Sequence, residues 1–152
     1  MNFKDNNVIN IVVVDDHPLI REALKISIQH HASLSLVALC KNREELMHYL
    51  THHNVDLLVL DYVLGGKDTV DGLQLIKQLR AHYPKLKILM YSAIESPALV
   101  QMVLKNGVRG YISKTKEVGE LIEAILQIAR GKRVVSDDMQ YELDRFGAGE
   151  KS

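Results

Sequence analysis

The sequence of 152 residues predicts one α/β domain in which a parallel β-sheet lies between two layers of helices. Five short, almost wholly apolar runs alternate along the chain with amphipathic stretches of helical period. Strands that are apolar on both faces are typical of parallel sheets that helices cover on both sides. Because the crossovers in such sheets are right-handed, the expected fold is a doubly wound (βα)5 sandwich.

The five expected strands lie at 8–14, 34–39, 56–60, 86–91 and 108–112, and the helices that follow them at 18–28, 42–53, 72–83, 97–106 and 116–130. The first strand is β-branched and nearly continuous, and Pro18 after it suits the first turn of a helix. The second strand is followed by Asn42 and, three residues later, by Glu45, which is the spacing of a capping box. The third strand is apolar throughout after its first residue, Asp56.

The remaining elements are defined by signals at the helix ends. Pro84 ends the third helix, and the fourth apolar run follows it directly. Ser96 and Pro97 form a good N-cap and first-turn pair for the fourth helix. The Asn-Gly pair at 106–107 suits the end of that helix, and Gly131 suits the end of the fifth.

The charge balance and the single cysteine limit the classes of protein. The chain has 19 basic and 19 acidic residues, but residues 1–76 carry a net −4 and residues 77–152 a net +4. A net charge of zero argues against binding nucleic acid by charge alone. Cys40 has no second cysteine to pair with, and we find neither a signal peptide nor an apolar run long enough to span a bilayer. We therefore expect a soluble cytoplasmic protein.

Polar residues follow four of the expected strands at the edge where a doubly wound sheet binds its ligands. Asp15 and Asp16 follow the first strand, Asp61 the third, Ser92 the fourth and Lys114 the fifth. Taken singly, such an aspartate is often only a turn or N-cap residue, and such a lysine is usually a solvated surface charge. Taken together, three carboxylates at one edge need a cation in order to coexist.

The residue types at this edge indicate phosphoryl chemistry. Hard carboxylate oxygens in a partly open site suit Mg²⁺, which retains water and often shares a phosphate. Asp61 is a candidate nucleophile that would form an aspartyl phosphate. Lys114 by charge and Ser92 by hydrogen bonding would hold the other phosphoryl oxygens, while the metal neutralises charge on the transferring group.

Four segments at these strand ends resemble the receiver domain of two-component response regulators, which has a CheY-like, or flavodoxin-like, fold. They are Val-Val-Val-Asp-Asp-His-Pro at 12–18, Leu-Leu-Val-Leu-Asp at 57–61, Ser-Ala at 92–93 and Tyr-Ile-Ser-Lys at 111–114. The Asp-Asp-His-Pro start and the Gly-Lys-Arg after the last helix resemble the NarL/FixJ (LuxR-type) class. The resemblance covers residues 8–131 and implies a five-stranded parallel sheet of order 2-1-3-4-5.

The resemblance implies a phosphoacceptor and a metal site. Asp61 would accept a phosphoryl group from a sensor histidine kinase or a histidine phosphotransfer protein. Asp16, Asp61 and the backbone carbonyl of Val63 would bind Mg²⁺ directly, and Asp15 would act through water. The domain would catalyse only its own phosphorylation and dephosphorylation, so it is not expected to be an enzyme acting on other substrates.

The resemblance also implies a switch. Ser92 and Lys114 would contact the phosphoryl group, and Tyr111 would turn inward when Ser92 moves. The surface of the fourth helix, fifth strand and fifth helix would then change and favour a homodimer or a partner. Transcription factors of this class carry a C-terminal helix-turn-helix domain, so we expect contact with DNA only through such a domain, and no contact with membranes.

One segment departs from the family pattern. Receivers usually place an Asp-Gly pair about seven residues after the phosphoacceptor, whereas Asp71-Gly72 lies ten residues after Asp61. Gly65-Gly66 in the segment 62–71 suggests a longer and more mobile loop, explained either as a tolerated insertion or as a partner-binding element. A longer loop here also occurs in capsule-regulator (Rcs-type) members, so the chain resembles that subgroup as well.

We predict slow loss of the phosphoryl group. In the family, the residues two positions beyond the phosphoacceptor and two beyond the hydroxyl residue tune hydrolysis, and here they are Val63 and Ile94. Neither side chain can hydrogen-bond an attacking water. Loss of label from the isolated phosphorylated chain should therefore be slow, and Val63→Asn should accelerate it; a half-life of seconds in the wild type would contradict the prediction.

Three other functions remain as alternatives. A phosphatase of the haloacid-dehalogenase type also uses Mg²⁺ and an aspartate nucleophile, but it needs a second acid where Val63 stands, and steady turnover of a phosphomonoester would support it. A flavodoxin-like FMN protein needs a Ser/Thr/Gly-rich first loop, which here carries two carboxylates. His48 and His52 suggest zinc, but no cysteine or HExxH pattern accompanies them, and solvated histidines explain them better.

The expected domain organisation does not decide whether the receiver acts through a DNA-binding domain or through protein contacts. We expect a disordered N-terminus at 1–7, the receiver domain at 8–131 and a linker or tail at 132–152 with a short helix over 136–146. The favoured interpretation is the input half of a DNA-binding transcription regulator without its helix-turn-helix domain. A stand-alone receiver that acts through protein contacts, as a phosphorelay shuttle or an anti-regulator, is the alternative. The length of the encoded open reading frame distinguishes the two.

Overall fold

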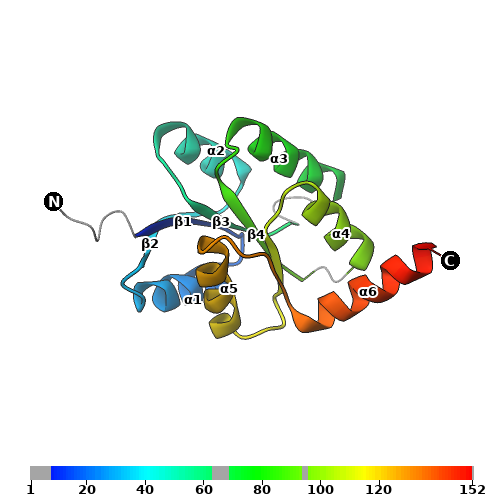
Figure 1. Cartoon of the computed structure of the whole chain (residues 1–152). Coiled ribbons are helices and arrows are strands. Elements are labelled where there is room, and N and C mark those ends of the chain that lie inside the picture. Colours follow the sequence, from blue (N-terminus) through cyan, green and yellow to red (C-terminus); the bar gives the residue numbers. More distant parts are fainter. Residues whose placement is uncertain (1–7, 63–68, 94–95, 152) are drawn as a thin grey trace.

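A parallel sheet of six strands forms the middle layer of the protein (Figure 1). The computed structural model describes residues 8–62, 69–93 and 96–151. The strands lie in the order β2-β1-β3-β4-β5-β6. In chain order they are β1 Ile9–Val14, β2 Leu34–Cys40, β3 Leu57–Leu60, β4 Lys87–Ser92, β5 Gly110–Ser113 and β6 Val134–Val135.

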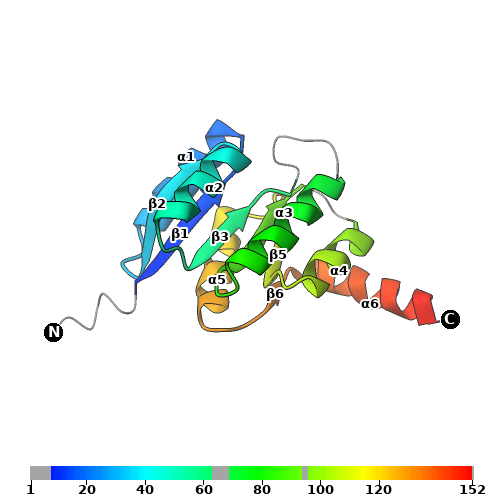
Figure 2. The ribbon, with the colours of Figure 1, turned by 90° about the horizontal axis from the view of Figure 1, so that it is seen from above.

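Helices cover both faces of the sheet, as Figure 1 shows. On one face lie α1 Pro18–Gln29 and α5 Val118–Ala129; on the other lie α2 Arg43–His52, α3 Thr69–His82 and α4 Pro97–Lys105. The last helix, α6 Asp137–Lys151, runs beside α4 in both views (Figures 1 and 2). No helix in the described part of the chain is long and apolar enough to cross a bilayer.

The alternation of side chains along each strand divides the apolar interior into two cores. Ile11 and Val13 of β1 point to the α1–α5 side, where they join Leu24 and other buried residues. Val12 and Val14 point to the opposite side, under α2, α3 and α4. These last four residues of β1 are almost completely buried, which explains why they are apolar without a polar alternation.

The expected helix-end signals act as predicted. Asn42 Oδ1 accepts a hydrogen bond from Glu45 N at 2.9 Å, which is one half of a capping box. Glu45 Oε1 accepts in return from Lys41 N at 2.8 Å, one residue before the N-cap. At the start of α4, Ser96 Oγ accepts from Leu99 N at 3.3 Å. Gly107 has φ 96°, which is a left-handed conformation that favours glycine after a helix.

The sheet prediction was wrong in one respect: the sheet has six parallel strands rather than five. Val134 N donates to Arg109 O at 3.0 Å and Ser136 N to Tyr111 O at 3.3 Å, so β6 extends the predicted order beyond β5. A strand of two residues has no periodicity of its own, and only its pairing with β5 identifies it. The expected N-terminus at 1–7 and most of the loop at 62–71 lie outside the described residues.

Candidate functional site

Two aspartates are fixed side by side at the carboxyl edge of the sheet by the pairing of their strands. β1 and β3 are hydrogen-bonded neighbours, and Asp15 and Asp61 are the residues that directly follow them. Asp61 N donates to Val14 O at 3.1 Å, and Asp15 N donates to Cys40 O at 3.0 Å. The side chain of Asp15 is only 2% exposed and that of Asp61 only 5%, so both carboxylates are poorly solvated.

Lys114 bridges these two carboxylates. Its backbone N donates to Ser92 O at 2.9 Å, which aligns the residue after β5 with the end of β4. Its Nζ lies 2.7 Å from Asp15 Oδ2 and 3.1 Å from Asp61 Oδ2. Burial lowers the pKa of Lys114, but the hydrogen bonds and charges of Asp15 and Asp61 outweigh it and raise the pKa above its ordinary value. The amine is therefore a fixed positive charge at the site.

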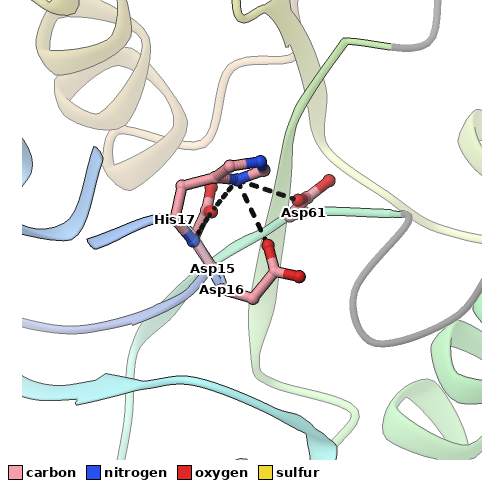
Figure 3. A group of neighbouring side chains, drawn as sticks. All are labelled: Asp15, Asp16, His17 and Asp61. Atoms are coloured by element: carbon pink, nitrogen blue, oxygen red, sulfur yellow. Dashed lines mark hydrogen bonds and ion pairs between the residues drawn. The ribbon is translucent and has the colours of Figure 1, made fainter. Parts of the chain in front are cut away.

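The His17 imidazole lies among the carboxylates, as Figure 3 shows. Its Nδ1 is 2.6 Å from Asp15 Oδ1, 3.2 Å from Asp16 Oδ1 and 4.0 Å from Asp61 Oδ2. The backbone N of His17 also donates to Asp15 Oδ1 at 2.8 Å. The ring is 59% exposed, so the histidine covers the carboxylates from the solvent side without being enclosed by them.

The donor set of this cluster fits Mg²⁺. One ligand atom from each of Asp15, Asp16, His17 and Asp61 lies within 4.8 Å of all the others. Three of these four groups are carboxylates, which are the hard oxygen ligands that Mg²⁺ prefers. Asp16 is 50% exposed, so water molecules can complete the coordination at this side. His17 is the poorest of the four as a magnesium ligand, because Mg²⁺ prefers oxygen to imidazole nitrogen.

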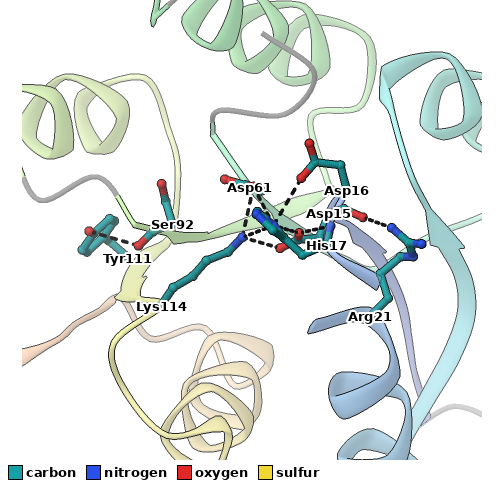
Figure 4. Close-up of polar contacts among 8 residues, drawn as sticks. All are labelled: Asp15, Asp16, His17, Arg21, Asp61, Ser92, Tyr111 and Lys114. Atoms are coloured by element: carbon teal, nitrogen blue, oxygen red, sulfur yellow. Dashed lines mark hydrogen bonds and ion pairs between the residues drawn. The ribbon is translucent and has the colours of Figure 1, made fainter. Parts of the chain in front are cut away.

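Ser92 and Tyr111 lie together on the other side of Lys114 (Figure 4). Ser92 ends β4 and is completely buried, and the Tyr111 side chain in β5 is 1% exposed. The Tyr111 hydroxyl donates to the backbone oxygen of Ser92 at 3.5 Å. Tyr111 is therefore turned inward in this structure, and its hydroxyl contacts the residue that is expected to respond to a phosphoryl group.

The structure thus brings together six of the site residues expected from the sequence, which are Asp15, Asp16, Asp61, Ser92, Tyr111 and Lys114 (Figure 4). The other two, Val63 and Ile94, lie outside the described residues, so their roles stay predictions.

Two further residues contact the site, and the sequence analysis assigned neither a role. His17 belongs to the Asp-Asp-His-Pro motif, which by itself assigns no function to its imidazole. Arg21 Nη1 donates to Asp15 O at 2.7 Å and so holds the backbone between the two first-loop aspartates. The available signal was the spacing, because Arg21 lies one helical turn after His17 at the start of α1, and its backbone N donates to His17 O.

Comparison with known sequences finds a receiver-domain family model and relatives that are transcriptional regulatory proteins. A family model described as the response regulator receiver domain matches residues 11–126. The transcriptional regulatory protein RcsB of Salmonella typhi is 25% identical over 143 residues, which are 94% of this chain and 66% of that protein. The probable transcriptional regulatory protein NarL of Mycobacterium tuberculosis (strain CDC 1551 / Oshkosh) is 29% identical over 131 residues, which are 86% of this chain and 59% of that protein. The chain therefore spans less than two thirds of the length of these relatives.

Solved structures share the fold. The isolated REC domain of RcsB from Salmonella enterica serovar Typhimurium, in the presence of phosphomimetic BeF3⁻, matches with a TM-score of 0.81 at 24% identity, over 89% of this chain and 98% of that chain. A LuxR-family two-component response regulator from Aurantimonas sp. SI85-9A1 matches with a TM-score of 0.82 at 25% identity, over 93% and 99% of the two chains. The flavodoxin-like receiver fold predicted from the sequence is confirmed.

Proposed function

The chain belongs to the response regulator receiver domain family, and we propose that Asp61 is the residue that accepts its phosphoryl group from a histidine kinase or a histidine phosphotransfer protein. The observation that carries the proposal is the bridge from Lys114 Nζ to Asp61 Oδ2 at 3.1 Å beside two further aspartates. A carboxylate oxygen of Asp61 would attack the phosphorus of a phosphohistidine. The P–O bond would form as the P–N bond breaks, and the imidazole would leave with a proton.

The charges around Asp61 suit this transfer. Lys114 faces the carboxylate and would pair with phosphoryl oxygens as they arrive. Asp16 and Asp61 would hold Mg²⁺ directly and Asp15 through water, and the bound ion would supply positive charge that offsets the negative charge of the phosphoryl group. Receiver-family membership argues against the haloacid-dehalogenase type of phosphatase, because the expected outcome is one modification of the chain itself rather than turnover of a substrate.

Asp16→Asn is expected to weaken Mg²⁺ binding, because it removes one of three carboxylate charges while its half-exposed position leaves the fold unaffected. We expect a loss of at least about tenfold, since even groups that only orient a metal ligand have effects of that size. Calorimetric titration measures the affinity, and intact mass after incubation with acetyl phosphate measures phosphorylation. Phosphorylation of the variant should fail at low Mg²⁺ and recover at high Mg²⁺.

The matched control is Glu22→Gln, which removes one exposed acidic charge from α1 outside the carboxylate cluster. It should leave both measurements unchanged. Equal Mg²⁺ affinity in Asp16→Asn and the wild type would contradict the metal assignment, and phosphorylation of the wild type without any divalent cation would contradict the proposed role of the metal.

The proposed switch reaches the C-terminal helix through Tyr111. Met139 of α6 is 5% exposed and belongs to the same apolar core as Tyr111, with Leu143 packed against it. Ser136 N, just before α6, donates to Tyr111 O at 3.3 Å. Because the Tyr111 side chain is already inward and its hydroxyl donates to Ser92 O, we infer that a shift of Ser92 toward a phosphoryl group would alter this hydrogen bond rather than turn the ring inward, and would loosen the docking of α6.

Phosphorylation is thus expected to speed amide hydrogen exchange in α6. The change should reach about tenfold, which corresponds to about 1.4 kcal/mol of lost local stability. Exchange measured by mass spectrometry on the full chain, with and without acetyl phosphate and Mg²⁺, tests this result. The helix α2 serves as an internal reference and Asp61→Asn as the unphosphorylated control. An equal change in α2, or no change in α6, would contradict the coupling.

The proposed context is control of a DNA-binding output. Both relatives are named as transcriptional regulatory proteins, and a solved structure contains two RcsB dimers bound to two parallel DNAs. We propose that phosphorylation of this receiver favours a homodimer and so controls an output domain outside residues 1–152. A stand-alone receiver that acts through protein contacts remains the second candidate, and the length of the open reading frame decides between them.

A further inference from the structure

A cationic cleft of about 500 Å³ lies at the edge of the sheet opposite to the aspartates. Its residues come from the ends of α3 and α4, the segment that leads into β4, the loop before β5 and the loop between α5 and β6. The cleft is lined by five basic side chains, which are Arg80, Lys85, Lys87, Arg109 and Arg133. No acidic residue within the described part of the chain lines it. A second cleft shares Lys85 and Lys87 and extends the positive surface toward Arg130; it also includes Asp56, whose backbone oxygen accepts a hydrogen bond from Lys87 N at 3.1 Å.

These five cations form no ion pair within the part of the chain that the structure describes. Among residues 8–62, 69–93 and 96–151, every ion pair involves His17, Lys114, Lys116 or Arg145, and none involves a side chain of the cleft. Five positive charges that are gathered in a concave place repel one another and produce a strongly positive potential. Such an arrangement lowers stability unless an anion binds there, which distinguishes the cleft from the scattered charges of an ordinary surface.

Three of the cations are nevertheless held in fixed positions by backbone carbonyl groups. Arg80 Nη1 donates to Pro84 O at 3.0 Å and to Leu86 O at 3.1 Å. Arg109 Nη2 donates to Gly131 O at 2.8 Å, and Lys87 Nζ donates to Ala129 O at 3.2 Å. A carbonyl orients the side chain without cancelling its charge. The cleft therefore presents preorganised positive groups, and the buried Nε of Arg109 has no hydrogen-bond acceptor among the described residues.

We propose that this cleft is a binding site for a small anion that carries a pyrophosphate group, either free or as part of a nucleotide. Guanidinium groups match phosphate oxygens in pairs, and lysines add charge without a fixed geometry. A volume of about 500 Å³ is within the range of small-molecule sites and favours a compact ligand over an extended acidic protein segment. The site uses none of the residues of the phosphoacceptor cluster, so it is independent of the proposed phosphorylation.

The test is titration of the isotope-labelled chain with pyrophosphate in metal-free buffer of low ionic strength, followed by backbone amide resonances. Gly107 and Gly131 both line the cleft and report on it directly. We expect saturable shifts of both glycines that weaken as salt is added. ADP and inorganic pyrophosphate are titrated separately, because similar affinities point to the shared group and tighter binding of ADP points to a nucleotide.

The informative variant is Lys85→Glu with Arg133→Glu. Both side chains are exposed and form no ion pair in the described part of the chain, so the fold should remain intact. The matched control is Lys25→Glu with Lys77→Glu, which has the same change in charge on exposed positions of α1 and α3 outside the cleft. Affinity should fall at least about tenfold in the first variant and stay unchanged in the second.

Three results would overturn the proposal. The first is the lack of saturable shifts at Gly107 and Gly131 in the wild type. The second is an equal loss of affinity in the two double variants, which would indicate a general effect of net charge. The third is tighter binding of a polyglutamate peptide than of pyrophosphate, which would assign the cleft to an acidic protein segment instead.

Discussion

Asp61→Asn is expected to abolish phosphorylation of the chain by acetyl phosphate, with no species heavier than the unmodified protein in an intact-mass spectrum. The amide retains the shape of the side chain but lacks the nucleophilic carboxylate oxygen. Asp61 directly follows β3, is only 5% exposed and lies with its Oδ2 3.1 Å from Lys114 Nζ. The variant should still fold, because asparagine can accept the hydrogen bond from Lys114.

The matched control is Asp56→Asn, at the other end of the same strand. Asp56 lies directly before β3, is exposed, and accepts a hydrogen bond from Asn10 N at 2.8 Å, which an asparagine oxygen can also accept. This variant should gain one phosphoryl group at the rate of the wild type. Phosphorylation of Asp61→Asn at an undiminished rate would refute the assignment of Asp61.

Lys114→Met is expected to lower the free energy of unfolding by about 3 kcal/mol in the absence of Mg²⁺, because removal of one partner leaves buried charges uncompensated. The charges concerned are the carboxylates of Asp15 and Asp61, which are 2% and 5% exposed. Methionine retains most of the length of the lysine side chain. Urea unfolding measures the loss, and Mg²⁺ should restore part of it because the ion replaces the missing positive charge. A loss below about 1 kcal/mol would contradict the role of this bridge.

The effect of Lys114 should also depend on pH. Because the acidic partners raise the pKa of Lys114 above its ordinary value of 10.5, the charged amine stabilises the folded state. This contribution is complete below pH 10.5 and is lost as the pH rises through the pKa of the folded state. The difference in unfolding free energy between the wild type and Lys114→Met should therefore stay constant from about pH 7 to about pH 10 and shrink above that. A difference in unfolding free energy that grows with rising pH would contradict a stabilising charge on Lys114.

The position of the candidate site follows from the sequence, because parallel strands bring their carboxyl ends to one edge. Asp15, Asp61 and Lys114 are far apart in the sequence, and β1, β3, β4 and β5 pair in the order that gathers them. Helix boundaries are predicted where a side chain satisfies the backbone locally, as Asn42 does at the start of α2. Such signals depend only on residues close in the chain.

Features that depend on tertiary contacts cannot be predicted from the sequence alone. β6 is a strand only because it pairs with β5, and the helix expected over 136–146 continues to Lys151. Met139 belongs to the core only because α6 lies against α4. The position of His17 among three carboxylates depends on the loop that α1 and Arg21 hold in place, and its residue type alone does not predict it.

The role of Asp61 as phosphoacceptor is tested by locating the phosphoryl group in the wild-type chain. Treatment with acetyl phosphate and Mg²⁺, followed by borohydride reduction, converts a phosphorylated aspartate to homoserine, which peptide mass spectrometry identifies by position. We expect homoserine at position 61 and aspartate at positions 15, 16 and 56. Homoserine at any of these other positions, or a phosphoryl group on a histidine with Asp61 unmodified, would contradict the proposed function.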